Sequence, residues 1–125
     1  MSYVDTNTRT FLNGGTALPM GERVYISSGV LASAGINVQE IGVTEEYIPA
    51  NEYGAVRLTS ASGTVRMRAS EAISVGSKVY TAAGGECSDT AAKTSYWIGW
   101  ALEESTAAGD IIEVLRGCGT NTAES

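Results

Sequence analysis

The chain contains no histidine among its 125 residues. Histidine is the most frequent general base in enzymes and the commonest metal ligand in proteins. Without it, the chain cannot build the Ser–His or Cys–His pairs that activate a nucleophile, nor the histidine-based sites that hold most catalytic zinc. The main routes to hydrolytic chemistry are therefore missing, and we expect a protein without a cofactor.

Cysteine is also scarce, with only Cys87 and Cys118. Two thiols are too few for a structural zinc site, which needs four nitrogen or sulfur ligands. Neither cysteine lies in a C-x-x-C motif, and the first ten residues are polar throughout, unlike a secretory signal. We expect two reduced thiols in a protein made in a cytoplasm, with a disulfide as the alternative if the fold brings the two together.

Basic residues are outnumbered, because 8 Lys and Arg face 14 Asp and Glu, for a net charge of −6 at pH 7. Nucleic-acid binding by counterion release needs clustered Lys and Arg, so the composition argues against such a partner. No apolar run approaches the roughly 18 residues that a membrane span requires. We expect a soluble protein with neither a nucleic-acid nor a membrane partner.

The remaining route to catalysis is a pair of carboxylates that act as acid and base. Two adjacent pairs occur, Glu45-Glu46 and Glu103-Glu104. Adjacent side chains of a strand point to opposite faces, so neither pair places two carboxyl groups across a glycosidic bond. The sequence also lacks the phosphate-binding, calcium-binding and nucleophile motifs. These acids are more typical of solvated turns, and we expect no enzyme.

What the chain does have is glycine, 15 residues against 2 prolines, together with many Ser, Thr and Val. Short alternating or β-branched runs, separated by turn residues, predict strands within 23–28, 38–44, 55–59, 64–68, 78–81, 96–102 and 110–115. About seven short strands at this spacing predict a mainly β fold, a small β-sandwich or barrel. Residues 29–35 read as a small-residue linker, and the only plausible helical piece is Ala69–Ile73.

The predicted strands 55–59 and 64–68 read as a hairpin closed by S-A-S-G. A period of two places Val56 and Val65 on its core face. The opposite face carries three arginines, Arg57, Arg66 and Arg68. They form either ordinary surface ion pairs with the surplus glutamates or a contact with an acidic partner, because arginine is favoured at interfaces.

The first twenty residues carry no sustained period, and N-G-G followed by Pro19 interrupts them. We therefore divide the chain into an extended N-terminal arm over 1–20, a β domain over 21–117 and a loose tail over 118–125. The arm holds apolar residues, among them Tyr3, Phe11 and Leu12. It either lies on its own domain or docks on a neighbouring molecule.

Two strand-like runs, 96–102 and 110–115, are joined by a short polar connection and read as a β-hairpin or β-arch. Parity places Trp100 on the core face and Trp97 on the outer face. In the last strand Ile112 and Val114 share the core parity, which leaves Ile111 and Leu115 outside. Trp97, Ile111 and Leu115 are our candidates for an oligomer interface.

The same local pattern occurs twice, because S-V-G-S (74–77) and A-A-G-D (107–110) each place a glycine step before a strand. With Y-W-I-G-W-A-L-E-E over 96–104 and I-I-E-V-L-R-G over 111–117, this pattern resembles the small phage capsid cement proteins, a family once labelled only as a domain of unknown function. The resemblance covers 75–117 closely and 21–74 loosely.

This resemblance implies a role that composition could not supply. Such proteins stud the outer surface of an icosahedral phage head, usually as trimers, and clamp neighbouring subunits of the major capsid protein against internal DNA pressure. We therefore expect a homotrimer on the virion, made in the host cytoplasm. The arginine face and the residues Tyr3, Phe11 and Leu12 are the candidate capsid-binding residues.

Two other functions remain open. A glycan-binding β-module of a virion or cell surface would use exposed aromatic residues, and Trp97 with Tyr47 or Tyr53 could supply them. A hydrolase that uses carboxylates alone is the third hypothesis, although no two acids have a motif spacing.

Overall fold

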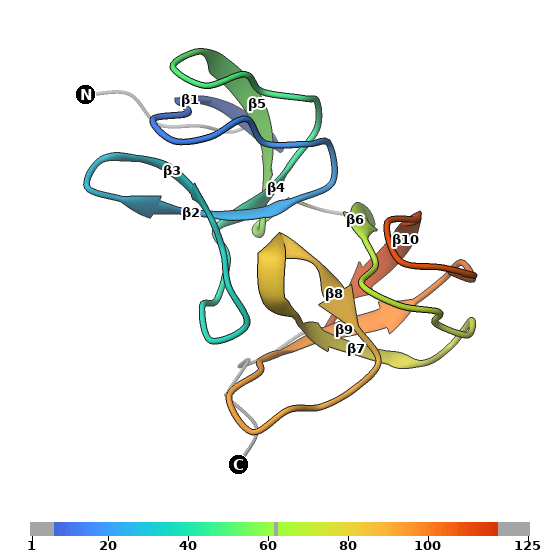
Figure 1. Cartoon of the computed structure of the whole chain (residues 1–125). Helices are drawn as coiled ribbons and strands as arrows, with labels where there is room; N and C mark the ends of the chain where they lie inside the picture. The colour runs from blue at the N-terminus through green and yellow to red at the C-terminus, as the bar shows by residue number, and fades with distance from the viewer. Residues whose placement is uncertain (1–6, 62, 118–125) are drawn as a thin grey trace.

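The computed structural model describes residues 7–61 and 63–117 (Figure 1). Within these residues the chain forms ten strands and one short 3-10 helix. They are β1 (Thr8–Leu12), β2 (Arg23–Ser27), β3 (Val30–Ser33), β4 (Gly42–Thr44), β5 (Tyr53–Leu58), β6 (Val65–Arg68), β7 (Lys78–Thr81), η1 (Ala83–Gly85), β8 (Cys87–Ser88), β9 (Trp97–Ala101) and β10 (Ile111–Arg116).

The strands form two antiparallel sheets of five strands each, in the orders β1-β5-β4-β2-β3 and β6-β10-β9-β7-β8. We call residues 8–58 the first lobe and residues 65–116 the second lobe. The first lobe lies above the second in Figure 1, and the chain passes once from one to the other. The predicted mainly β fold of the small sandwich or barrel class is confirmed.

The two lobes have the same topology, because each strand of the first sheet has its counterpart five strands later in the second. The edge strands of each sheet also meet at one parallel bridge, Asn13 to Leu31 in the first lobe and Ala69 to Cys87 in the second. A second, antiparallel bridge repeats likewise, Leu18 to Ile48 and Ile73 to Ser105. The fold is therefore an internal structural repeat.

A faint sequence repeat accompanies this topology. Residues 17–25 read A-L-P-M-G-E-R-V-Y and residues 72–80 read A-I-S-V-G-S-K-V-Y, each leading into the second strand of its lobe. The glycines of the two segments, Gly21 and Gly76, have φ angles of 83° and 88°. This left-handed conformation is one that glycine adopts without a steric penalty, which explains why both lobes keep it there.

Each lobe has its own hydrophobic core. In the first, the cluster consists of Leu18, Val24, Leu31, Ile48 and Val56, with Phe11 packed against it. The cluster of the second lobe is larger and is built mainly of its own residues, among them Met67, Ile98 and Val114. It also takes in Val43 from β4 of the first lobe, so the second core extends across the lobe boundary.

Three strands were not predicted from the sequence. They are β1, which fell in the predicted arm, β3, which fell in the predicted small-residue linker, and β8, which fell in a polar stretch. Propensity misses them because pairing with a neighbour, rather than local composition, makes them strands. The predicted helical piece Ala69–Ile73 is wrong as well, since both of its ends form β-bridges.

The predicted hairpin of 55–59 with 64–68 is also wrong. β5 pairs with β1 and β4 in the first sheet, whereas β6 pairs with β10 in the second. The segment between them therefore links the two lobes. The alternation was right even so, because Val56, Val65 and Met67 are all buried. The second predicted hairpin is confirmed, since β9 and β10 are antiparallel neighbours.

Where the structure describes the predicted arm, it is part of the first lobe. β1 pairs with β5 over five residues, from Thr8 opposite Arg57 to Leu12 opposite Tyr53. Leu18 belongs to the core. The expectation of an extended arm is thus wrong for residues 8–18, and the predicted tail 118–125 lies outside the described residues. Among the described residues, no helix is both long and apolar enough to cross a membrane.

Candidate functional site: the lobe junction and the interaction surfaces

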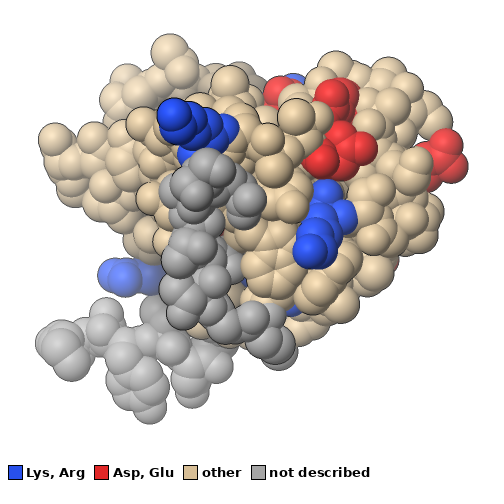
Figure 2. Space-filling view, turned by 90° about the horizontal axis from the view of Figure 1, so that it is seen from below, with Lys and Arg blue, Asp and Glu red and all other residues tan. Residues whose placement is uncertain are grey.

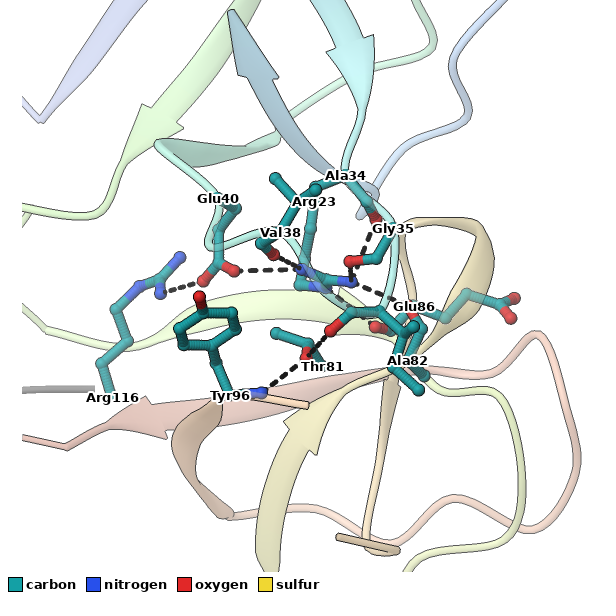
Figure 3. Close-up of polar contacts among 11 residues, drawn as sticks. Arg23, Ala34, Gly35, Val38, Glu40, Thr81, Ala82, Glu86, Tyr96 and Arg116 are labelled. Atoms are coloured by element: carbon teal, nitrogen blue, oxygen red, sulfur yellow. Dashed lines mark hydrogen bonds and ion pairs between the residues drawn. The ribbon is translucent and has the colours of Figure 1, made fainter. Parts of the chain in front are cut away.

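The side chain of Arg23, the first residue of β2, is completely buried where the two lobes meet (Figure 3). On the second lobe, its Nε donates to the carbonyl of Glu86 at 2.8 Å and its Nη2 to that of Ala82 at 2.7 Å. On the first lobe, its Nη atoms donate to the carbonyls of Ala34, Gly35 and Val38 at 3.0 to 3.2 Å. One guanidinium group therefore ties together the backbone of both lobes.

Glu40 neutralises this buried charge. One carboxylate oxygen lies 3.1 Å from Arg23 Nη1, and the other accepts a hydrogen bond of 2.7 Å from Arg116 at the end of β10 (Figure 3). Burial by itself would raise the pKa of Glu40, but the nearby charges of Arg116 and Arg23 outweigh burial and hold that pKa below its usual range. The carboxylate thus stays ionised at neutral pH and forms a second link between the lobes.

A second set of contacts surrounds this pair. Arg68 of β6 lies 3.6 Å from Glu22 of the first lobe and 3.2 Å from Glu86 of its own lobe. The hydroxyl of Thr81 donates across the junction to the carbonyl of Ile36 at 2.6 Å. Burial raises the pKa of Glu22. These contacts hold the two lobes in one orientation.

No pattern in the sequence predicted this junction. Arg23 reads as the polar start of an alternating strand, and Glu40 as one acid in a strand-like run. The alternation does assign Arg23 the parity opposite to Val24, but the sequence alone predicts that such a residue meets solvent. It is buried because the second lobe covers that face, which no local pattern encodes.

The structure separates the three residues of the predicted arginine face. Arg57 lies in the first lobe, 3.8 Å from Glu45, and donates to the carbonyl of Thr64 at 3.0 Å. Arg66 is exposed on β6, opposite Glu113 in the strand register. Arg68 makes the junction contacts described above. The set is therefore not one face of one sheet.

Arg57 and Arg66 nevertheless come close to each other, because both line one pocket of about 460 Å³ between the lobes. The other charged residues of its lining are Glu45, Glu103 and Glu113. The hydroxyl of Thr64 donates to Glu113 at 2.5 Å, and the amide of Glu113 donates to Glu103 at 2.7 Å. Three carboxylates and two guanidinium groups make this a polar site suited to a charged protein side chain.

Trp97 and Leu115, two of the three predicted interface residues, meet on the outer face of the second sheet. Leu115 is 40% exposed and pairs with Trp100, whose ring centroid lies 5.0 Å from that of Trp97 in an edge-to-face arrangement. Ile111 lies on the same face at the other end of β10, opposite Arg68. The outer face thus carries an apolar group of Trp97, Trp100 and Leu115, whereas Ile111 lies apart from it beside Gly21 of the first lobe.

The prediction that the two tryptophans point to opposite faces is wrong. Val79 pairs with Gly99 but Tyr80 pairs with Trp97, so Ile98 is an extra residue in β9. Such a β-bulge reverses the alternation. As a result Ile98 and Ala101 both reach the core, and Trp100 turns outward beside Trp97.

The two predicted arm residues of β1 lie on opposite faces of the first sheet. Phe11 faces inward and packs against the first core, with the guanidinium of Arg9 5.1 Å from its ring centroid. Leu12 shares the opposite face of the sheet with Tyr53, its register partner, which is 69% exposed. Tyr3 lies outside the described residues.

The aromatic residues of the glycan hypothesis do not come together. Tyr47 and Tyr53 are both well exposed, but they belong to the first lobe. Trp97 lies on the second lobe, beside Trp100. The structure therefore offers no single aromatic platform built from these three residues.

Cys87 is a free, buried thiol in the described part of the chain, and Cys118 lies outside that part. Burial raises the pKa of Cys87 to about 12. A thiol of this kind is a packing residue rather than a nucleophile. Among the described residues, no group of three Cys, Asp or Glu side chains is arranged to hold a metal ion.

A family model described as phage cement protein matches residues 5–116, which include all ten strands. The chain belongs to the phage cement protein family. Its role is therefore that of a structural protein that decorates a phage capsid, and it is associated with the virion. The resemblance noted in residues 75–117 is confirmed, and the match extends it to the first lobe.

Comparison with curated proteins gives no match for this cement protein. Among solved structures, it is similar to the N base of the head fiber protein gp8.5 of bacteriophage phi29. The TM-score is 0.70 at 15% sequence identity, and the match covers 88% of this chain and 94% of the other. At this identity the likeness shows a common fold for the two chains.

Proposed function

We propose that this cement protein binds the outer surface of an icosahedral head as a homotrimer and stabilises the shell by bridging subunits of the major capsid protein. It acts structurally and without catalysis, and it is made in the host cytoplasm. Each trimer that bridges several subunits adds binding free energy that must be lost before the shell can open.

The observation that carries this proposal is the lobe junction. A bridge between shell subunits transmits force only if its own parts do not separate. In this chain the junction is closed by a buried arginine with six hydrogen bonds or ion-pair contacts and by a carboxylate between two arginines. The two lobes therefore act as one stiff unit with a contact surface on each.

The apolar group on the second lobe supports self-association. Trp97, Trp100 and Leu115 lie together on its outer face. The third predicted residue, Ile111, is on the same face but at the other end of β10, beside the first lobe. Figure 2 views the molecule from the second-lobe end; the described part of this face carries a few separate basic side chains, and acidic ones lie towards one edge. The apolar group favours association because its burial removes apolar area from water.

The capsid contact is assigned to a different part of the surface. Arg66 is exposed at the pocket between the lobes, and Arg57 lies beside it in the same lining. Arg57 is already engaged by Glu45 and Thr64, so the exposed guanidinium of Arg66 is the group that would pair with an acidic side chain of a shell subunit. Leu12, on the open face of the first sheet, extends this surface. Tyr3 stays a candidate from the sequence and lies outside the described residues. Phe11 and Arg68 act indirectly by holding β1 and the junction in place.

The test uses heads assembled without the protein. Purified protein added to such heads should co-sediment with them at saturation and raise the temperature at which they release DNA. Arg66→Gln should weaken binding, whereas the matched variant Lys93→Gln, another exposed basic residue, should not. Heads that bind the protein and still open at the same temperature would contradict the bridging role.

A further inference from the structure

The junction within one chain consists of a row of residues on the first lobe and a turn of the second lobe that packs on it. Because the two lobes repeat each other, each half has an equivalent elsewhere on the surface. In the first lobe, Arg23, Val43 and Arg57 are neighbours across β2, β4 and β5. This row faces the second lobe, since Arg23 bonds to it, Val43 belongs to its core and Arg57 lines a pocket together with residues of that lobe. We call these three residues the first row.

The second lobe has an equivalent row that faces no lobe of its own chain. Lys78, Trp100 and Leu115 are neighbours across β7, β9 and β10, the counterparts of β2, β4 and β5. Lys78 and Leu115 are exposed, and Trp100 is half-buried beside Trp97. The first row is covered by the second lobe, whereas the second row presents the Lys78 ammonium and the apolar side chains of Trp100 and Leu115.

The element that sits on the first row also has a free counterpart. It is the β7–β8 connection, which holds the carbonyls of Ala82 and Glu86 that accept from Arg23. Its two central glycines, Gly84 and Gly85, have φ angles of 72° and 74°, and a Cβ on Gly85 would lie 2.3 Å from Glu22 of the first lobe. This turn is therefore packed tightly into the junction.

In the first lobe the matching turn joins β2 to β3 through Ser28 and Gly29, with φ angles of 52° and 85°. A Cβ on Gly29 would meet no atom of the described residues within 4 Å. Ile26, just before the turn, is 38% exposed, whereas its counterpart Thr81 is 1% exposed and donates across the junction. The β2–β3 turn is thus free, with an apolar residue at its base.

We propose that the β2–β3 turn of one chain docks on the row Lys78–Trp100–Leu115 of a second copy, in the way that the β7–β8 turn docks on the first row within the chain. The Lys78 ammonium takes the place of the Arg23 guanidinium and donates to the carbonyls of the turn. Ile26 covers Leu115 and Trp100. This inference rests on the proposed self-association, to which it gives a specific interface.

The physical case for a second copy as the occupant is continuity with the internal junction. That junction shows the β7–β8 connection seated on the first row, and the counterparts of both, the shorter β2–β3 turn and the second row, are present on every chain. The contact is heterologous, because the turn and the row are different surfaces, so copies join head to tail and a ring closes the assembly.

The experiment uses two single variants, Ile26→Glu and Leu115→Glu, each a change at a partly exposed position that the fold should tolerate. Each places a carboxylate in one half of the interface. Val75→Glu, at a residue 62% exposed and outside both surfaces, is the matched control. The readout is the molar mass measured by light scattering at micromolar concentration. Circular dichroism verifies that each variant is folded. If Leu115→Glu does not fold, Lys78→Glu takes its place.

We expect each interface variant alone to be a monomer, while the wild type and Val75→Glu assemble. Mixed together, the two variants should form a one-to-one dimer and nothing larger, because only one intact turn and one intact row remain between them. If both interface variants still assemble to the molar mass of the wild type, this interface is overturned and the proposed homotrimer remains. A wild type that is monomeric both free and on heads would instead contradict the homotrimer itself, and this interface with it.

Discussion

At the scale of single residues, the arrangement of the two lobes depends on the buried charge of Arg23. An isolated guanidinium in the interior is very unfavourable, and only a paired carboxylate with full hydrogen bonding makes it tolerable. Arg23 meets this condition with Glu40 and with backbone carbonyls from both lobes. The pair therefore specifies one arrangement of the lobes, since any other leaves the charge without partners.

Glu40→Gln should accordingly lower the free energy of unfolding by about 3–5 kcal/mol at pH 7, because it leaves two buried or half-buried arginines without their carboxylate. The pKa of Glu40 is lower in the folded protein than its ordinary value of 4.5. Its stabilising contribution is therefore complete above that value and is lost as the pH falls through the folded pKa. Denaturant unfolding between pH 7 and pH 3 measures both effects.

The wild type should lose stability over the acid part of that range, and Glu40→Gln should lose less. Glu22 works with the opposite sign, since burial raises its pKa and its contribution is lost as the pH rises through the folded value. Glu40→Gln leaves the contribution of Glu22 unchanged. Glu104→Gln, at an exposed residue, is the control and should follow the wild type. Equal acid sensitivity of the wild type and Glu40→Gln would show that the pair does not govern the junction.

At the scale of elements, β1 and β9 contribute most to the surfaces and the stability of the two lobes. β1 is an edge strand of the first sheet, held by pairing with β5 and by Phe11. β9 contains the bulge at Ile98, which brings both tryptophans to the outer face. Bulges often re-aim a side chain in this way at a functional surface.

The role of β1 predicts different results for two N-terminal truncations. Removal of residues 1–6 should leave the unfolding free energy close to that of the full chain, because β1 is intact. Removal of residues 1–12 should unfold the first lobe, since it deletes the strand and its core contact. Circular dichroism with denaturant measures this difference.

Phe11→Ala separates packing from pairing. We expect a loss of about 1–3 kcal/mol, because the ring is only partly buried. Thr10→Ala, at the neighbouring exposed position, should change little. A stable, fully folded protein without residues 1–12 would mean that β1 is a dispensable arm after all.

At the scale of the whole molecule, attachment to the head should rest mainly on buried apolar area, with the exposed arginine contributing chiefly to the rate of encounter. Surface charges are screened over a Debye length of about 8 Å at physiological ionic strength, whereas buried apolar area contributes on the order of 25 cal/mol per Å² with little dependence on salt. An avid assembly bridging several subunits should therefore stay on the head as the salt concentration rises.

Arg66→Gln should slow association with heads a few-fold and change release less, because a charge at the rim acts mainly on encounter. Binding to immobilised heads over a salt series measures both rates. Arg66 is the residue to change, since Arg68 and Arg57 also hold the structure together. Rapid release of the wild type at high salt would show that charge carries the attachment.

Local pattern was sufficient to predict the class of the fold and much of its strand content. The alternation in 64–68, 78–81 and 110–115 reports which residues face a core, because the period of a strand is fixed by backbone geometry. The absence of histidine and the acidic balance come from composition alone. The glycine steps and the run 96–117 were sufficient to indicate the family, which the match over 5–116 confirms.

Pairing between distant segments was decided only by the tertiary structure. Nothing local distinguishes a hairpin of 55–59 with 64–68 from a crossover between lobes, because the same alternation suits both. Nor does a sequence show that an extra residue in β9 reverses its parity, or that Arg23 is covered by the second lobe. The repeat of 17–25 in 72–80 is present in the sequence, but four identical residues in nine are too few to indicate a duplicated lobe by themselves. The shared strand order of the two sheets is what identifies the duplication.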